Sequence, residues 1–351
     1  MAEPWVGIIA NPVSARDIRR VIANAASLQI TDRANIVLRV LACLKACGIQ
    51  RVMMMPEAGG IRGHVKRGLD RSANRGEMEF PELSFVDMRV TGTVEDSRRA
   101  AAAMCAAGAS AIVVLGGDGT HRAVASACGK VPLAGISTGT NNAFPEHREP
   151  TVTGLAVGLA VAGRIPASVA FQSNKRFVVS VNEGAVEEIA LVDVAVVTER
   201  YVGARALWRT ETFRELLVAF ADPEVIGLSA IAGLLEPVSR REPGGLLVSM
   251  CPPEEAPLVL HAPIAPGYMR DIGILGWRRL QAGKPHRPSI AAGSIALDGE
   301  RELSFSERDR VVINLEEGAL TTIDVGACMH YAARHALMHS SRVAALTRAA
   351  S

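Results

Sequence analysis

A glycine-rich segment of the chain reads Gly116-Gly117-Asp118-Gly119-Thr120, between the apolar run Ala111–Leu115 and a helical pattern that starts at Thr120. Glycines accept positive φ and let backbone amides come close to an anion. A helix N-terminus adds N–H donors and a favourable dipole. The carboxylate of Asp118 beside phosphates would accept a proton from an attacking hydroxyl or help to hold Mg²⁺. We therefore predict a nucleotide-phosphate site, with a plain glycine-rich turn capped by Asp as the alternative.

Apolar runs and helical patterns alternate through the first third of the chain. The runs are Trp5–Ala10, Arg51–Met55, Phe85–Val90, Ala111–Leu115 and Leu133–Ile136. Strand, helix, strand at this spacing is typical of a parallel sheet with helices on both faces. Ligands bind beyond the carboxyl ends of such strands. The pattern predicts a Rossmann-like α/β domain with the glycine-rich segment at its ligand-binding edge.

The pattern changes near Pro166, where short β-rich runs joined by turns indicate mainly antiparallel structure. A helical insert is expected at Arg205–Ala221, and a closing helix at Ala332–Thr347. We expect an α/β nucleotide-binding domain over residues 1–165 and a β-rich acceptor-binding domain over residues 166–330. A C-terminal helix in residues 331–351 would pack back on the first domain.

Composition narrows the possible function. The chain has 351 residues and a formal net charge of +2, which does not favour a nucleic-acid partner. None of its lysines stands in a GxxxxGK[ST] frame, so a P-loop NTPase is excluded. Its six cysteines form no CxxC pair, which disfavours a metal centre. Arginine-rich stretches such as Arg62–Arg75 and Arg240-Arg241 are expected on solvated faces.

The chain shows no sign of a membrane or secretory segment. No cationic stretch followed by an apolar core opens it. The longest uncharged run, Ala100 to Gly117, is broken at Gly108 and is interpreted as a buried helix and a buried strand. We expect a cytoplasmic protein with no membrane partner.

A second polar loop extends from Gly135 to Pro145 after the predicted strand Leu133–Ile136. Its small hydroxyl, amide and glycine residues would face the first loop across neighbouring strand ends. Residues 135–139 also match GxSxG, the nucleophile elbow of hydrolases, which must lead directly into a helix. Pro145 delays any helix to about Thr151, so a ligand-binding loop is the better interpretation.

The order of strand, GGDGT, helix, strand and polar loop resembles the superfamily of NAD kinases and of diacylglycerol and sphingosine kinases. Three segments are most similar to the acetoin-catabolism protein X group of this superfamily, namely 10–15, 135–145 and 226–233. The resemblance covers nearly the whole chain. It implies an α/β nucleotide-binding domain followed by a β-rich domain, with ATP, as its Mg²⁺ complex, as phosphate donor.

The resemblance implies a site made of both loops and the end of the first strand. The candidate nucleotide-binding residues are Asn11, Ser14, Arg16, Gly116, Gly117, Gly119, Thr120, Ser137, Gly139, Thr140, Asn141 and Asn142. Asp118 is the candidate catalytic residue. His121, at the predicted helix start, would touch ATP or serve as an ordinary capping or solvent-exposed residue.

Two further elements resemble family motifs. Asn182 and Glu183 resemble the NE motif with which NAD kinases hold the acceptor dinucleotide, so they are candidate acceptor-binding residues. Asp298, with Gly299 and Glu300, resembles the lipid-kinase DGE element, which makes Asp298 a second candidate catalytic residue. A tight turn between strands is the alternative for this Asp-Gly pair.

The resemblance implies an ATP-dependent kinase that phosphorylates a hydroxyl of NAD or a related soluble acceptor, with a link to acetoin catabolism. We expect small-molecule nucleotide substrates and a homo-oligomer. A lipid kinase is the first alternative, although Arg122-Ala123 stands in place of the Asn-Glu, and Ala143 in place of the Asp, of the lipid-kinase motifs. A nucleotide-binding regulator without catalysis is the second. It is kept open because the Thr-Pro-Thr that precedes the GSTAY element of NAD kinases is missing and Leu228 replaces the serine.

Overall fold

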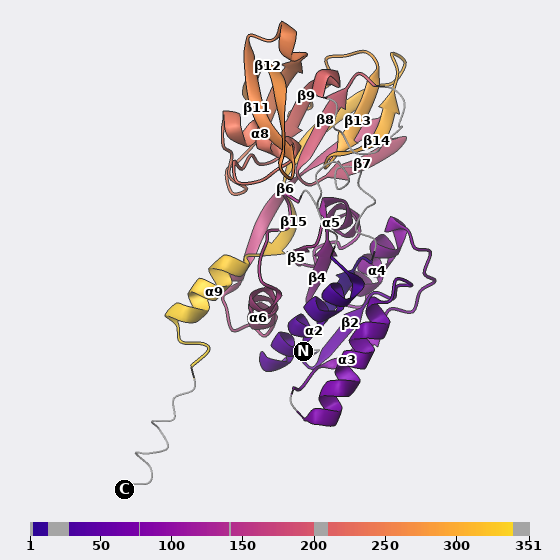
Figure 1. Ribbon diagram of the computed structural model, residues 1–351, viewed down its shortest axis with the longest axis vertical. Coiled ribbons are helices and arrows are strands. Elements are labelled where there is room, and N and C mark those ends of the chain that lie inside the picture. The colour runs from indigo at the N-terminus through magenta and orange to yellow at the C-terminus, as the bar shows by residue number, and fades with distance from the viewer. Residues whose placement is uncertain (1–2, 13–27, 77, 140–141, 200–209, 340–351) are drawn as a thin grey trace.

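The computed structural model describes residues 3–12, 28–76, 78–139, 142–199 and 210–339. Two sheets dominate it, and Figure 1 shows them one above the other along the long axis. The first is eight-stranded with the order β3-β2-β1-β4-β5-β15-β6-β7, and the second is seven-stranded with the order β11-β12-β10-β9-β8-β13-β14.

Parallel strands form the first part of the eight-stranded sheet, as the alternating pattern predicts. They are β3 (Glu82–Phe85), β2 (Arg51–Met54), β1 (Val6–Ala10), β4 (Ala111–Gly116) and β5 (Leu133–Ser137). Every residue of β1 and β4 is buried, because helices cover both faces of these central strands. The expected strand at Phe85–Val90 lies a few residues earlier, as β3.

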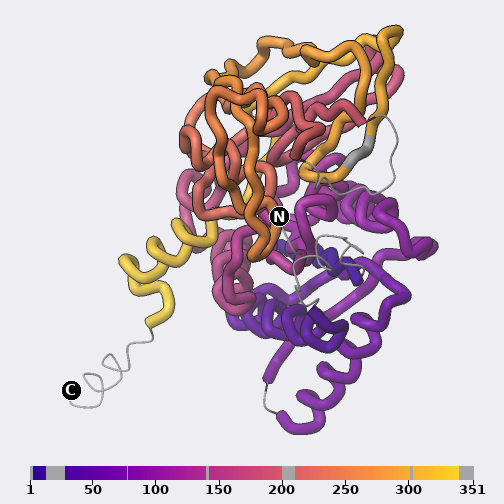
Figure 2. Tube along the Cα trace, turned by 45° about the horizontal axis from the view of Figure 1, so that its top comes forward, coloured from indigo at the N-terminus to yellow at the C-terminus, as the bar shows by residue number. Residues whose placement is uncertain are grey.

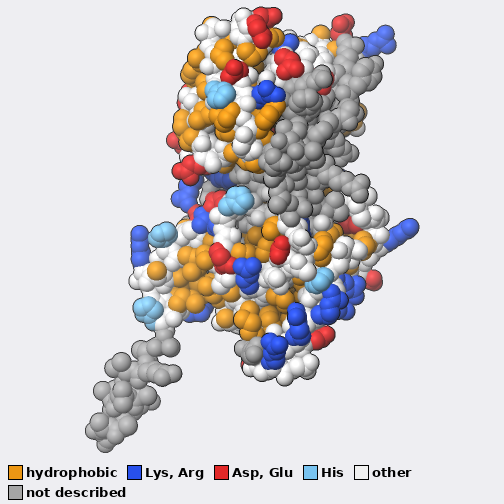
Figure 3. All heavy atoms as spheres, in the orientation of Figure 1, with side chains coloured by type: hydrophobic (Ala, Val, Ile, Leu, Met, Phe, Trp, Pro, Cys, Tyr) orange, Lys and Arg blue, Asp and Glu red, His pale blue; other side chains and the backbone are white. Residues whose placement is uncertain are grey.

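A helix follows each of these strands along the chain. The helices are α2 (Ile30–Ala46), α3 (Ile61–Arg75), α4 (Val94–Ala106), α5 (Asp118–Ala125) and α6 (Pro150–Val161). One core joins α4 and α5 to the sheet, and a second core joins α2 and α6 to its other face. The basic residues of α3 lie on its solvent face, as expected, and Figure 3 shows Lys and Arg side chains gathered there.

The eight-stranded sheet is completed by strands from later in the chain. After the short helix α7 (Ala167–Ala170), β6 (Phe171–Val181) pairs antiparallel with β7 (Val186–Ala190) and with β15 (Val311–Ile323). β15 pairs in parallel with β5 at Thr322 and Leu133. The long strands β6 and β15 belong to the first sheet and extend up to the second (Figure 1).

The second sheet is antiparallel throughout. Its strands are β8 (Asp193–Val197), β9 (Phe213–Val218), β10 (Gly245–Cys251), β11 (Leu258–Ala265), β12 (Tyr268–Leu280), β13 (Gly293–Leu297) and β14 (Glu300–Phe305). Helix α8 (Leu228–Leu235) packs on it, and short 3₁₀ turns occupy Thr210–Thr212 and Pro253–Glu255. This confirms the predicted α/β part followed by a mainly antiparallel part.

Two predicted helices differ from the structure. Residues 213–218 of the expected insert form β9, whose sequence Phe-Arg-Glu-Leu-Leu-Val does not show a strand's alternation because nearly all of the strand is buried; residues 205–209 lie outside the described residues. The closing helix α9 is Val325–Arg334 and so begins earlier than Ala332. It packs on α6 and α7, and Figure 2 shows it beside the first sheet's helices.

In the described part of the chain, no helix is long and apolar enough to cross a membrane.

Candidate functional site

The two polar loops leave the same edge of the first sheet. Gly116 ends β4 and is paired with Ser137, the last residue of β5. Gly117 precedes α5, whose first residue is Asp118. The backbone N–H of Thr138 donates to the carbonyl of Gly116 at 3.1 Å. The carboxyl ends of neighbouring parallel strands therefore bring both loops together, as predicted.

Glycines are required where the two loops touch. A Cβ atom added to Gly139 would lie 2.9 Å from the Cα of Gly117, and one added to Gly117 would lie 2.9 Å from Oδ1 of Asn142. The Asn142 side chain lies against both glycines, and its Nδ2 donates to Oγ of Ser137 at 2.7 Å. The backbone approach leaves no room for a larger residue at Gly139.

The carboxylate of Asp118 links the first loop to the end of the second. One of its oxygens accepts the backbone N–H of Ala143 at 3.0 Å, and the other accepts that of Phe144 at 2.9 Å. Asp118 is buried. Two hydrogen bonds to an ionised carboxylate fix this side chain and the loop together.

Asn11 joins the end of β1 to the same site. Its side-chain amide donates to the hydroxyl of Thr120 at 3.0 Å. The carbonyl of Asn11 in turn accepts the guanidinium of Arg33 at 2.6 Å, and Arg33 is almost fully buried in α2. Of the other candidate nucleotide-binding residues, Ser14, Arg16, Thr140 and Asn141 lie outside the described residues.

The second sheet meets the first loop through the turn between β13 and β14. Asp298 occupies this turn with φ of 52°, and its carboxylate accepts the backbone N–H groups of Leu191 and Val192 at 3.0 and 2.8 Å. A Cβ atom added to Gly119 would lie 3.9 Å from Oε2 of Glu300. The DGE element thus lies beside the GGDGT loop.

The surroundings of Asp298 change its acidity. Burial raises the pKa of Asp298 to about 7, the charge of Arg122 opposes this rise, and the charge of Asp118 adds to it. Arg122 also donates to the carbonyl of Leu297 at 2.8 Å, which ties α5 to β13. A carboxyl group that titrates near neutral pH beside a candidate phosphate loop is suited to proton transfer.

Two protein-family models match the two parts of the chain. The ATP-NAD kinase N-terminal domain family matches residues 6–164, and the acetoin catabolism protein X C-terminal domain family matches residues 175–318. The acetoin catabolism protein X of Cupriavidus necator is 55% identical over 340 residues, which cover 96% of this chain and 94% of that protein.

The chain belongs to the acetoin catabolism protein X family. A solved structure, yeast NADH kinase complexed with NADH, is 11% identical and superposes with a TM-score of 0.50, covering 97% of this chain and 89% of that one. This likeness shows that the family member described here has the NAD kinase fold.

The structure does not bring Asn182 and Glu183 to this site. They form the exposed turn between β6 and β7, with φ of 53° and 57°. The side-chain amide of Asn182 donates to the Asp309 carboxylate and accepts the backbone N–H of Arg310. Glu183 forms an ion pair with the Arg310 guanidinium at 2.6 Å. The five residues of β7 place the turn about 17 Å from Leu191, beside Asp298. Both residues tie the hairpin to the segment that precedes β15.

Two charged residues near the site, Arg240 and Asp193, are not indicated by any motif of the sequence. Arg240 was expected on a solvated face, yet its guanidinium lies 4.0 Å from the ring of Phe220 and bonds the carbonyl of Ala143. Asp193 is buried in the second sheet and accepts the N–H of Gly299 at 3.2 Å. The first contact is between distant segments, so no local pattern signals it.

His121 is fully buried, which excludes the exposed role considered for it. Its Nδ1 donates to the carbonyl of Gly117 at 2.9 Å, and its ring packs near Phe144. Burial lowers the pKa of His121 to about 4. His121 therefore stabilises the GGDGT loop from the buried side, as a neutral side chain.

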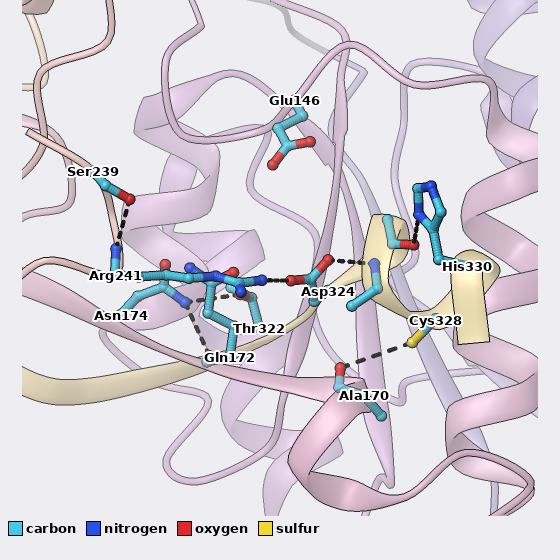
Figure 4. Close-up of polar contacts among 12 residues, drawn as sticks. Glu146, Ala170, Gln172, Asn174, Ser239, Arg241, Thr322, Asp324, Cys328 and His330 are labelled. Carbon is cyan, nitrogen blue, oxygen red and sulfur yellow. Dashed lines mark hydrogen bonds and ion pairs between the residues drawn. The ribbon is translucent and has the colours of Figure 1, made fainter. Parts of the chain in front are cut away.

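A cavity of about 590 Å³ lies on the other side of Phe144. It is lined by residues of both sheets, including Asn174, Arg240, Arg241 and Asp324. Figure 4 shows part of this wall, where Arg241 pairs with Asp324 and Asn174 donates to Thr322. The cavity lies between the segment 239–242 and the start of α9, and Gly135, Phe144 and Pro145 of the second polar loop also line it.

Among the described residues, no group of three or more metal-ligating side chains is found. Both oxygens of Asp118 already accept backbone N–H groups. The described side chains therefore do not form a complete Mg²⁺ site of their own.

Proposed function

We propose that this protein is an ATP-dependent phosphotransferase acting on a hydroxyl of NAD or a related soluble acceptor, in the cytoplasm and within acetoin catabolism. The observation that carries the proposal is the meeting of the Asp298 turn with the Gly116–Thr120 loop. One element can bind phosphates, and the other holds a carboxyl group that titrates near neutral pH.

ATP would bind through backbone amides at the N-terminus of α5. Thr120 and Asn11 would add polar contacts, and Ser137, Gly139 and Asn142 would form the opposite wall. The glycines allow the phosphates to approach the backbone closely, which explains why no P-loop lysine is needed. Mg²⁺ bound to ATP would neutralise phosphate charge, and it would be held mainly by the phosphates because the described residues supply no three-ligand group.

Asp298 is the proposed base. As the acceptor oxygen attacks the γ-phosphorus, the hydroxyl proton passes to the Asp298 carboxylate, and the bond to the ADP leaving oxygen breaks. Asp118 keeps a second role. Its two bonds to Ala143 and Phe144 hold the ATP-facing loops in place, and its charge raises the basicity of Asp298.

The proposed division of the chain follows from these roles. Residues 1–165 would bind the nucleotide, residues 166–330 would supply Asp298 and the acceptor surface, and the C-terminal segment 331–351 would pack on the first part. NAD remains the proposed acceptor because the chain shares a fold with an NADH kinase. Asn182 and Glu183 are left out of the acceptor site, because they lie far along β7.

A second candidate function is a nucleotide-binding regulator without catalysis. The observation that favours it is the use of both Asp118 and Asp298 as acceptors of backbone N–H groups. Carboxylates occupied in this way stabilise loops whether or not a proton is transferred.

The deciding experiment combines calorimetry with a transfer assay. The full chain is titrated with ATP, ADP, NAD, NADH and NADP in the presence of Mg²⁺. ATP is then mixed with each dinucleotide, or with vesicles that contain diacylglycerol, and each mixture is analysed for a phosphorylated product. A phosphorylated dinucleotide supports the proposal. ATP binding without transfer to any acceptor favours the regulator, transfer to diacylglycerol in vesicles favours a lipid kinase, and no nucleotide binding overturns all three.

A further inference from the structure

Arg240 and Asp118 lie on opposite sides of a single peptide group. The guanidinium of Arg240 donates to the carbonyl of Ala143. The N–H of the same peptide group, which belongs to Phe144, donates to Asp118 at 2.9 Å. A cation of the second half of the chain is therefore connected to the GGDGT carboxylate through one amide.

The Arg240 guanidinium is held in a fixed orientation. It lies 4.0 Å from the centre of the Phe220 ring and 5.4 Å from that of Phe144. Burial lowers the pKa of Arg240, while the charges of Glu146, Asp118 and Asp222 act in the opposite direction. An arginine in this setting stays protonated, because its ordinary pKa lies far above neutrality.

The backbone that carries Arg240 is also anchored. The buried ammonium of Lys175, on β6, donates to the carbonyls of Ser239, Glu242 and Gly244 at 3.3, 2.7 and 2.7 Å. Three bonds to one short segment fix residues 239–244 against the strand that connects the two sheets. Arg240 therefore projects from a rigid base.

We propose that Arg240 is a positioning residue. It holds the Asp118 carboxylate in place through the peptide group between Ala143 and Phe144. Hydrogen bonds in a chain polarise one another, so a cation on the carbonyl strengthens the N–H as a donor to the carboxylate. The second sheet thus acts on the GGDGT loop from two sides, through Asp298 and through Arg240. This inference concerns the loop itself and holds whether or not phosphate is transferred.

Amide hydrogen exchange of the full chain, followed by mass spectrometry, tests it. In Arg240→Met, we expect the Ala143 and Phe144 amides to exchange about tenfold faster or more, since a bond to a charged group is lost. The Leu191 and Val192 amides, which Asp298 holds, should not change. Arg240→Lys should restore part of the protection, because it keeps the charge but not the planar donor group.

Arg241→Met is the matched control. Arg241 is the neighbouring arginine of the same segment, but it pairs with Asp324 on the other side of the cavity. In Arg241→Met, the amides of Ala143 and Phe144 should exchange at the wild-type rate. Unchanged exchange in Arg240→Met, or equal acceleration in Arg241→Met, overturns the inference.

Arg240→Gln adds a readout that lost packing alone would not move, and it serves if the Met variant fails to fold. It keeps an N–H donor and removes the charge. In an active enzyme, the acid limb of the pH profile of kcat reports the protonation of the proposed base, Asp298. This limb should move to higher pH in Arg240→Gln and stay in place in Arg241→Met. An unmoved limb in both variants contradicts the inference. If the wild type transfers no phosphate, the proposed function fails, and the exchange rates still decide the role of Arg240.

Discussion

Asp298 titrates in the electrostatic field of Asp118, although the two residues come from different sheets. Burial raises the pKa of Asp298 to about 7, and the charge of Asp118 adds to the rise while Arg122 opposes it. Each carboxylate accepts backbone N–H groups within its own part of the chain, Asp118 from Phe144 and Asp298 from Val192, whereas the charge of Asp118 acts on Asp298 across the junction. The pair therefore couples protonation to the contact between the sheets.

Asp298→Asn should flatten the pH dependence of stability. The folded pKa of Asp298 is about 7, above the value of 3.8 expected in the unfolded chain. The wild type should then lose stability relative to the Asn variant as pH rises from about 4 to 7, by on the order of a few kcal/mol. Asn accepts the positive φ of this turn, so the backbone is kept. Urea unfolding of both proteins at pH 4.5 and 7.5 measures the difference, and parallel stability curves would contradict the expectation.

Asp118→Asn should impair phosphate transfer and loosen the loop. The Asn side chain presents an NH₂ group to one of two backbone donors, so one hydrogen bond at Ala143 or Phe144 is lost. We expect a loss of about 1–3 kcal/mol in the free energy of unfolding and a lower turnover, because the loops proposed to face ATP are held less firmly. Chemical denaturation and a transfer assay measure the two effects. A stable variant with wild-type turnover would contradict the positioning role proposed for Asp118.

Gly139→Ala and Gly119→Ala should separate folding from nucleotide binding. A Cβ at Gly139 meets the backbone of Gly117 at 2.9 Å, so the loops must move, and we expect a loss of about 1–3 kcal/mol in stability. A Cβ at Gly119 meets only Oε2 of Glu300, at 3.9 Å. Gly119→Ala should therefore fold normally and bind ATP more weakly, because the methyl group obstructs the phosphate path. Calorimetric titration decides, and wild-type ATP affinity in a stable Gly119→Ala would place the phosphates elsewhere.

His121→Phe should remove a loss of stability at acid pH. The folded pKa of His121 is about 4, below its ordinary value of 6.5, so the unfolded chain binds the proton more readily. Stability from this residue is present above pH 6.5 and is lost as pH falls toward 4. The Phe variant should show a shallower decline over that range in thermal unfolding. The same decline in both proteins would mean that His121 is solvated.

The local parts of the fold could be predicted from sequence. The five parallel strands and the GGDGT turn follow from short-range apolar runs and from glycines placed before a helix. β9 could not be distinguished from a helix, because a strand buried on both faces lacks alternation. Likewise, α9 begins before its expected start because Asp324 is its N-cap residue and accepts the backbone N–H of Ala327.

The site could be predicted only in outline. The juxtaposition of the two polar loops follows from the rule for parallel strand ends, but the bonds from Asp118 to Ala143 and Phe144 depend on how the second loop folds back. Asn182 matches a motif by residue type, but in the structure its side chain bonds Asp309, a residue 127 positions away that no local pattern connects to it. Arg240 carries no local signal at all, since its contacts come from Phe220 and Ala143.

The parallel pairing of β15 with β5 has a consequence for biosynthesis. Residues 311–323 leave the ribosome long after residues 133–137, at about 5–20 residues per second. Until then, β5 presents an unpaired backbone edge to the crowded cell, and such an edge invites association with other chains. We expect the nascent protein to need shielding by chaperones over this interval, and a ribosome-stalled chain ending near residue 165 to aggregate more readily than one that extends past residue 335.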